Sequence, residues 1–323
     1  MKPREILSWK FGFYHLLPPL LRALGPKWGD ALLGSLGRCA APVFSPRRRA
    51  LGQALARART DLRADWTPEA IRPALAANTA RFLARDYPLD RLPANEVCAR
   101  FEVSGFEPLQ AALKEGRGAV LVGSHLGGHI AGLHWLYRRE VPLRLLVQRP
   151  CHISTELDRR FRADGPHPQE GFFLRRGLPP GQAVERLLRA RGALRDGLAV
   201  YLTGDIPWCG LNARPGRLLG QSQSFLAVWA DLAILTRAPV FLMFCTHEPG
   251  GRYRLTIDPP WTLQPGDEPA AVARYLARLD AEIAAHPSDA VAHLLWPCYG
   301  PPAPTPKVAL RPSRRVAAVG RVG

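Results

Sequence analysis

Between residue 101 and residue 257, short apolar runs alternate with segments of helical periodicity. The apolar runs, which predict strands, cover residues 101–103, 119–122, 143–147, 172–174, 198–202, 240–245 and 253–257. The amphipathic segments, which predict helices, cover residues 108–115, 132–139, 154–163, 181–190, 227–236 and 270–285. Strands separated by helices predict an α/β fold with a largely parallel central sheet flanked by helices. Gly250 and Gly251 predict a hairpin between the last two strands, so we expect the sheet to be mixed.

The first 95 residues show helical patterns and no strand pattern. Thr67 and Pro68 predict a helix start, with Thr67 as the N-cap, and this helix should run to about residue 85. A basic helix is predicted to begin at Pro46 and to run through Ala58.

Residues 1–36 form an amphipathic and aromatic segment. The uncharged run between Lys10 and Arg22 is shorter than the roughly 20 apolar residues that span a bilayer, and Pro18-Pro19 predicts a break in any helix there. An anionic membrane interface suits the basic and aromatic side chains of this segment, which are Lys2, Arg4, Trp9, Lys10, Tyr14, Arg22 and Lys27. The alternative to a segment that lies in the membrane interface is a pair of helices that packs on the core.

The chain therefore divides into three predicted regions. Residues 1–95 form a helical, membrane-associated segment that lies in the interface, and residues 96–300 form the α/β domain. Residues 301–323 combine prolines with arginines and small residues, a composition that predicts a basic, disordered tail.

The chain of 323 residues carries a formal net charge of +17, with 44 Lys and Arg against 27 Asp and Glu. Nucleic acid, an anionic membrane surface, and acidic small molecules or carriers all fit this balance. The sequence contains no zinc finger, no phosphate-binding Walker loop and no interleaved aromatic and basic RNA module. We therefore expect no nucleic-acid partner.

The pattern of cysteines and histidines predicts neither a metal nor a cofactor. The intervals between the cysteines are wide and uneven, which favours free thiols over a zinc site or a disulfide framework. His129 and His134 follow His125 on a predicted helix, but no acidic residue lies among them as it does in zinc-binding His-Glu-x-x-His sites. The six cysteines are Cys39, Cys98, Cys151, Cys209, Cys245 and Cys298.

His125 is the leading catalytic candidate. The strand at 119–122 leads into Gly123-Ser124-His125, and the glycine pair Gly127-Gly128 precedes a helix. An imidazole at a strand end can accept a proton near pH 7. A lone histidine is more often structural, but glycines allow a substrate or a backbone to approach closely, which favours a functional role.

A general base needs a partner that orients it, and this is normally a carboxylate. The sequence has no Asp or Glu between Arg117 and Arg139, so a partner for His125 must come from elsewhere in the fold. Asp205, at the end of the strand at 198–202, is the best remote candidate, and a turn or cap is its structural alternative. Glu170 and Asp231 come next.

Arginines near the predicted site can bind anions. Arg149 follows the strand at 143–147 and should lie at the same edge of the sheet as His125, where it can clamp a phosphate or carboxylate. The alternative is a solvated loop arginine. A basic face for a lipid phosphate or an acidic carrier protein is predicted from Arg159, Arg160, Arg162, Arg175 and Arg176.

The order of these motifs resembles that of the bacterial lipid A late acyltransferases, the lauroyl and myristoyl transferase branch of the lysophospholipid acyltransferase superfamily. The resemblance covers roughly residues 10–300. The motifs that carry it are Ser124-His125-Leu126-Gly127-Gly128-His129-Ile130, Arg149-Pro150, the helix 157–162, Val200 to Asp205, Leu218-Leu219-Gly220, Thr236-Arg237-Ala238-Pro239-Val240, Gly251 to Leu255 and Pro287 to Trp296.

The resemblance implies transfer of a fatty acyl group from acyl carrier protein or acyl-CoA to a hydroxyl of a lipid or glycolipid acceptor. His125 would be the general base, and Asp205 remains the candidate partner because of its place at a strand end. The resemblance also implies the cytoplasmic face of a bacterial inner membrane as the location. It marks as substrate-binding residues Gly127, Gly128, Arg149, Arg162 and Gly220.

One residue departs from the family pattern, which is His-x4-Asp/Glu. Ile130 stands where the acidic residue is expected. Without a carboxylate, catalysis by His125 should be slower by about 10² to 10⁴ unless another group substitutes. The alternative hypothesis is a non-catalytic homologue that binds acyl chains or an acyl carrier protein.

Overall fold

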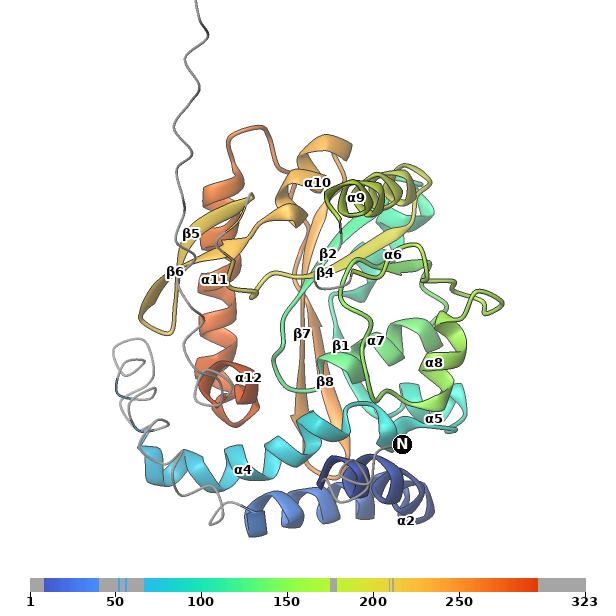
Figure 1. Cartoon of the computed structure of the whole chain (residues 1–323), viewed down its shortest axis with the longest axis vertical. Coiled ribbons are helices and arrows are strands. Elements are labelled where there is room, and N and C mark those ends of the chain that lie inside the picture. The colour runs from blue at the N-terminus through green and yellow to red at the C-terminus, as the bar shows by residue number, and fades with distance from the viewer. Residues whose placement is uncertain are drawn as a thin grey trace, which may run out of the picture.

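A mixed six-stranded sheet forms the centre of the computed structural model (Figure 1). The structure describes residues 9–40, 67–174, 179–208 and 212–295, with residues 52, 56 and 210. The strand order is β1-β8-β7-β2-β4-β3, and β8 and β1 run antiparallel to the other four. These strands are β1 (Phe101–Ser104), β2 (Ala119–Gly123), β3 (Leu143–Leu145), β4 (Ala199–Thr203), β7 (Val240–Glu248) and β8 (Arg252–Ile257). The predicted α/β class, the mixed sheet and the final hairpin are confirmed.

Helices cover both faces of the sheet because successive strand residues point to opposite sides. In β2, Val120 and Val122 join one apolar core, while Leu121 joins the other. The first core includes side chains of α9 (Pro180–Arg195), α10 (Val228–Thr236) and α11 (Glu268–Ala285). The second core is formed with α5 (Ala94–Cys98), α6 (Phe106–Lys114), α7 (His129–Arg138) and α8 (Thr155–Phe161).

A separate two-stranded sheet differs from the sequence-based prediction. It consists of β5 (Ala213–Leu218) and β6 (Gln221–Leu226), whose polar and arginine-rich sequences conceal a strand pattern. It packs on α11, and the backbone N–H of Leu219 donates to Asp280 at 3.0 Å. The predicted strand at 172–174 is wrong, because this segment makes only an isolated bridge between Leu174 and Gln148.

Two N-terminal helices lie side by side across one end of the sheet (Figure 1). They are α2 (Trp9–Ala40) and α4 (Pro68–Ala84), and the short turn η2 (Tyr87–Leu89) follows α4. Thr67 is the N-cap of α4, as predicted, and its hydroxyl accepts from the backbone N–H of Ala70 at 3.2 Å.

The predicted break at Pro18-Pro19 is wrong. Helix α2 runs through both prolines and instead kinks at Gly25, whose φ is 69°. Leu17 and Leu21 are buried in a small core that also contains Ala80 and Ala84 of α4. We infer that this packing holds the backbone helical despite the hydrogen bonds that two prolines remove.

Within the described ranges, no helix is both long enough and apolar enough to cross a membrane. The predicted helix at 46–58, apart from two isolated positions, and the predicted tail at 301–323 lie outside the described residues. The turn η3 (Pro287–Asp289) and helix α12 (Val291–Leu294) end the described chain and pack close to α4.

Candidate active site

The sheet register brings His125 and Asp205 together. Strands β2 and β4 are parallel neighbours, and Gly123 pairs with Thr203 at their carboxyl ends. His125 and Asp205 each follow two residues after these paired positions. The carboxyl edge of a parallel sheet is where such loops gather functional groups. The remote carboxylate partner predicted for His125 is therefore Asp205.

The carboxylate of Asp205 accepts three hydrogen bonds. Its Oδ1 lies 2.9 Å from Nδ1 of His125, and its Oδ2 accepts from the backbone N–H of His125 at 2.7 Å. Oδ2 also lies 2.9 Å from Nε2 of His293, a residue of α12. The side chain of Asp205 is only 1% exposed, so these donors hold it in one orientation. The backbone and side-chain contacts to His125 together fix the plane of the imidazole.

The pKa values of His125 and Asp205 are shifted in the directions expected of a base and its orienting acid. Burial by itself lowers the pKa of His125, but the charge and hydrogen bond of Asp205 outweigh burial and raise that pKa above its ordinary value. Burial likewise favours a raised pKa for Asp205, yet His125 and His293 hold it well below the usual range. Asp205 therefore stays ionised, and Nδ1 of His125 keeps its proton.

The other ring nitrogen of His125 is available for chemistry. No described residue forms a hydrogen bond with Nε2, and the His125 side chain is 41% exposed. With Nδ1–H donating to Asp205, Nε2 is the unprotonated nitrogen that can accept a proton from a bound hydroxyl.

The two neighbouring histidines have other surroundings. The ring of His129 lies 5.4 Å from that of His125, and burial lowers its pKa well below the ordinary value, so it stays neutral. His134 is buried and its Nδ1 lies 2.9 Å from Asp86, which also accepts from Ser154. Among the described residues, no group of three His, Cys, Asp or Glu side chains could hold a metal ion.

The glycine pair packs against the protein's own chain. A Cβ at Gly127, whose φ is 49°, would lie 2.7 Å from the carbonyl oxygen of Cys245. A Cβ at Gly128 would lie 2.8 Å from the ring of Tyr253. The backbone N–H of Gly128 donates to that Cys245 carbonyl at 2.9 Å, which ties the loop after His125 to β7. The close approach expected at these glycines is therefore to backbone and core.

Ile130 is buried in the core at the start of α7, with 5% of its surface exposed. A carboxylate there would face apolar side chains and would need a partner in that core. Because the acid reaches His125 from β4, position 130 is free to contribute apolar packing.

Asp289 supports the loop after His125 from the C-terminal side. Its backbone carbonyl accepts from the N–H of Gly127 at 3.0 Å. Its buried carboxylate lies 2.7 Å from Nδ1 of His247 and accepts from Asn78 Nδ2 at 3.0 Å. Asp289 thereby joins α4, β7 and the loop after His125.

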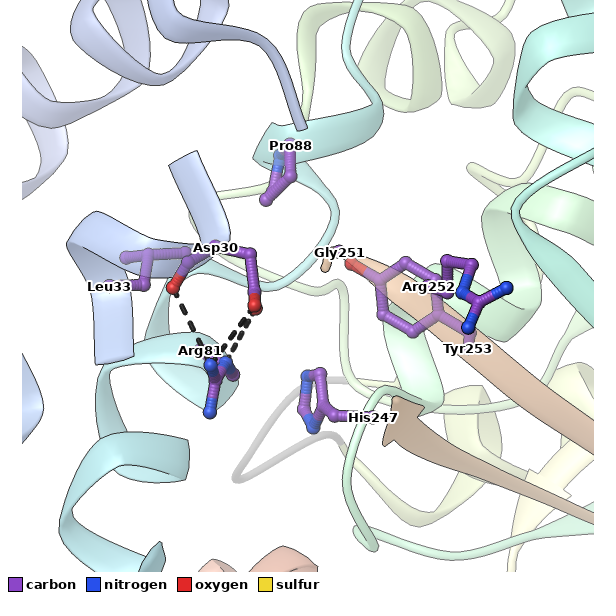
Figure 2. A pocket seen from close by; sticks show the side chains of 8 residues that line it. All are labelled: Asp30, Leu33, Arg81, Pro88, His247, Gly251, Arg252 and Tyr253. Carbon is purple, nitrogen blue, oxygen red and sulfur yellow. Dashed lines mark hydrogen bonds and ion pairs between the residues drawn. The ribbon is translucent and has the colours of Figure 1, made fainter. Parts of the chain in front are cut away.

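The same network continues to the N-terminal helix. Arg81 of α4 donates to Asn78 at 2.7 Å and to Asp30 of α2 at 2.6 Å. Figure 2 shows this ion pair beside His247 and Tyr253, around a small pocket between α2, α4 and the β7–β8 hairpin. The two N-terminal helices are therefore anchored by polar contacts as well as by the apolar core they share.

The other predicted binding residues lie on separate elements. Arg149 pairs with Asp158 at 2.6 Å on the surface, and Arg162 lies 3.9 Å from the same carboxylate. Gly220 occupies the β5–β6 turn with φ 73°. Within the described chain, none of these three forms a hydrogen bond or ion pair with His125 or Asp205.

The structure also shows where the two other candidate partners of His125 and the arginines of the predicted basic face lie. Asp231 on α10 lies 3.9 Å from Arg214, and Glu170 is exposed in a loop, so neither partners His125. Arg160 is largely buried between Glu140 and Glu156, whereas Arg159 is exposed. Arg175 and Arg176 lie outside the described residues.

Two comparisons with known proteins concern most of the chain. Residues 2–291 match the family model described as bacterial lipid A biosynthesis acyltransferase. The chain is also 29% identical over 286 residues to a phosphatidylinositol mannoside acyltransferase of Mycolicibacterium smegmatis (strain ATCC 700084 / mc(2)155). The matched region covers 86% of this chain and 87% of that protein. The family match includes His125, Asp205 and Asp289, and it ends two residues before His293.

Proposed function

Because the chain belongs to the bacterial lipid A biosynthesis acyltransferase family and is an acyltransferase of lipids, we propose that His125 is the general base of its reaction. The enzyme moves a fatty acyl group from a thioester, on acyl carrier protein or coenzyme A, to a hydroxyl of a lipid or glycolipid. The name of the M. smegmatis relative supports a glycolipid acceptor. The contact between His125 and Asp205 carries this proposal.

In the proposed reaction, Nε2 of His125 accepts the proton of the acceptor hydroxyl as its oxygen attacks the thioester carbonyl. The carbon–sulfur bond then breaks, and the imidazolium returns that proton to the leaving thiolate. Asp205 keeps Nδ1–H in place and stabilises the positive charge of the imidazolium. The net products are the acylated acceptor and the free thiol.

The non-catalytic alternative rested on Ile130, because a histidine without an acid is a weak catalytic group. Asp205 supplies a buried, ionised carboxylate from another strand, which supports catalysis over simple binding.

The first expected result is turnover by the full chain. Purified protein supplied with an acyl-acyl carrier protein or acyl-CoA and with a phospholipid or glycolipid acceptor should release one thiol for each acylated lipid formed. Thiol release and mass spectrometry of the lipid measure the two products. Binding of donor and acceptor without product above an enzyme-free control would support the non-catalytic alternative instead.

Helix α2 supports a location at a membrane surface, for which we propose the cytoplasmic face of a bacterial inner membrane. Leu16, Leu20 and Leu24 repeat every four residues and therefore share one side of the helix. Leu16 is 70% exposed, and Trp28, beyond the kink, is 65% exposed. Leu17 and Leu21 pack inward, so α2 has an apolar face toward the protein and another toward solvent.

Replacing Leu16 and Trp28 with serine should weaken binding to anionic vesicles at least tenfold, since each apolar side chain contributes about 1.5–3 kcal/mol when it leaves water. Flotation with phosphatidylglycerol and phosphatidylethanolamine vesicles measures the effect. Leu235→Ser on α10 is the matched control, because Leu235 is 66% exposed on a different element. Equal loss in control and double variant would contradict an interface formed by α2.

A further inference from the structure

Arg85 ends α4 in an unusual backbone conformation. It is the C-cap residue, with φ 54° and ψ −118°, and its N–H donates to the carbonyl oxygen of Arg81 at 3.0 Å. Such angles are rare for a residue with a Cβ and persist where the surroundings hold them, often at functional sites. The next residue, Asp86, is buried and anchored by Ser154 and His134, so the chain is fixed directly after Arg85.

The guanidinium of Arg85 is half-buried and unpaired. Among the described residues it forms no hydrogen bond or ion pair. Three partly buried arginines nearby are paired: Arg81 binds Asp30, Arg22 binds Asp90, and Arg138 binds Glu156. A half-buried cation without a protein partner is suited to an anion that arrives from outside.

Along the chain, Arg85 lies between a residue that contacts the histidine pair and a residue that lines a surface depression. On one side Phe82, one turn earlier on α4, has its ring 5.4 Å from that of His129, which lies 5.4 Å from His125. On the other side Tyr87, two residues later, lines the depression together with Arg149 and Ile153.

Electrostatics agree with this position. Burial is the largest influence on the pKa values of His125, His129, Tyr14 and Tyr87, and the positive charge of Arg85 makes a smaller, lowering contribution to each of them. Two of these groups are the histidine pair, and Tyr87 lines the depression. The ring of Tyr14 stacks on His152, a lining residue, with centroids 3.6 Å apart. The guanidinium is therefore within electrostatic reach of both places.

We propose that Arg85 is a substrate-binding residue that holds a phosphate group beside His125. This rests on the proposed function, because both substrate classes carry such a group: the pantetheine arm of the donor ends in a phosphate ester, and a phospholipid acceptor has a phosphodiester. The planar guanidinium can bind phosphate oxygens through two parallel hydrogen bonds. Arg149, which is 57% exposed, also lines the depression, but there it is paired with Asp158, so Arg85 is the arginine that offers an unpaired charge.

Occupancy of this site also affects the base. An unpaired Arg85 disfavours the imidazolium form of His125, and a bound phosphate neutralises that charge. Binding of substrate therefore raises the proton affinity of His125 when the acceptor hydroxyl is in place.

The test measures phosphate binding directly, without turnover. His125→Ala protein is titrated by calorimetry with desulfo-coenzyme A, which carries the donor's phosphate ester, and separately with monomeric dihexanoylphosphatidylglycerol, which carries a lipid phosphodiester. Adding Arg85→Gly to the His125→Ala protein also relieves the strained φ, and it should lower the binding affinity for one of the two probes by about 10- to 100-fold. The affected probe identifies donor or acceptor as the source of the phosphate.

Arg91→Gly is the matched control, because Arg91 is exposed and also has positive φ, at 65°. It should leave both affinities unchanged, and Arg85→Lys should recover part of the lost affinity. Equal affinity for both probes with and without Arg85, or no binding of either probe, would overturn the proposal. Arg85-dependent binding by a wild-type protein that transfers no acyl group would instead refute the proposed function alone.

Discussion

Replacing His125 with alanine should lower kcat for acyl transfer by about 10²- to 10⁴-fold, the contribution typical of a positioned general base. No described residue forms a hydrogen bond with its Nε2, its side chain is 41% exposed, and the neighbouring imidazole of His129 stays neutral. Single-turnover measurements with saturating donor and acceptor separate this chemical step from binding. The KM values should change little, because the imidazole is proposed to act on the proton in the transition state.

His129→Gln is the matched comparison for His125→Ala, since the two rings are 5.4 Å apart. The His129 variant should retain most of the activity, and a thermal melt of each variant checks that the fold is intact. The opposite order of activities would transfer the role of base to His129. Unchanged turnover in His125→Ala would remove the proposed mechanism altogether.

The wild-type pH profile follows from the same geometry. The base must be unprotonated, so the rate should rise with pH through the pKa of His125, which Asp205 raises above the ordinary value of 6.5.

The central fold could be predicted because local pattern and tertiary role agree there. Strands β2 and β4 are buried on both faces, and their apolar runs stand out in the sequence. The pairing of His125 with Asp205 was open to prediction for a related reason: both residues follow strand ends, and parallel strands place such ends at one edge. Ile130 obscured this relation only because the acid had been expected on α7.

The missed features depend on contacts distant in sequence. Asp289 and His293 reach the site from η3 and α12, and the Pro287 to Trp296 motif that contains them did not mark either residue as part of the site. The proposed site at Arg85 is indicated by its backbone angles and by the lack of a partner for its charge among the described residues. The continuous α2 helix likewise reflects packing against α4, which outweighs the local effect of Pro18-Pro19.

Asp205→Asn should lower kcat by about 10²- to 10⁴-fold while keeping the side-chain volume. The amide has one acceptor oxygen for three donors, so its NH₂ group must face Nδ1–H of His125 or the ring of His293. The imidazole then loses its preferred tautomer and the charge that stabilises its protonated form. Since Asp205 raises the pKa of His125, the basic form should appear at lower pH in the variant.

This shift distinguishes an orienting acid from a merely structural carboxylate. The residual rate of Asp205→Asn should reach its plateau at lower pH than the wild type, because loss of the carboxylate lowers the pKa of His125. Asp231→Asn is the control, since Asp231 lies on α10 beside Arg214, and it should leave both kcat and the profile unchanged. A fall in rate without movement of the pH limb, together with a lower melting temperature, would assign Asp205 to folding. A wild-type rate and profile in Asp205→Asn would mean that His125 works without an acid.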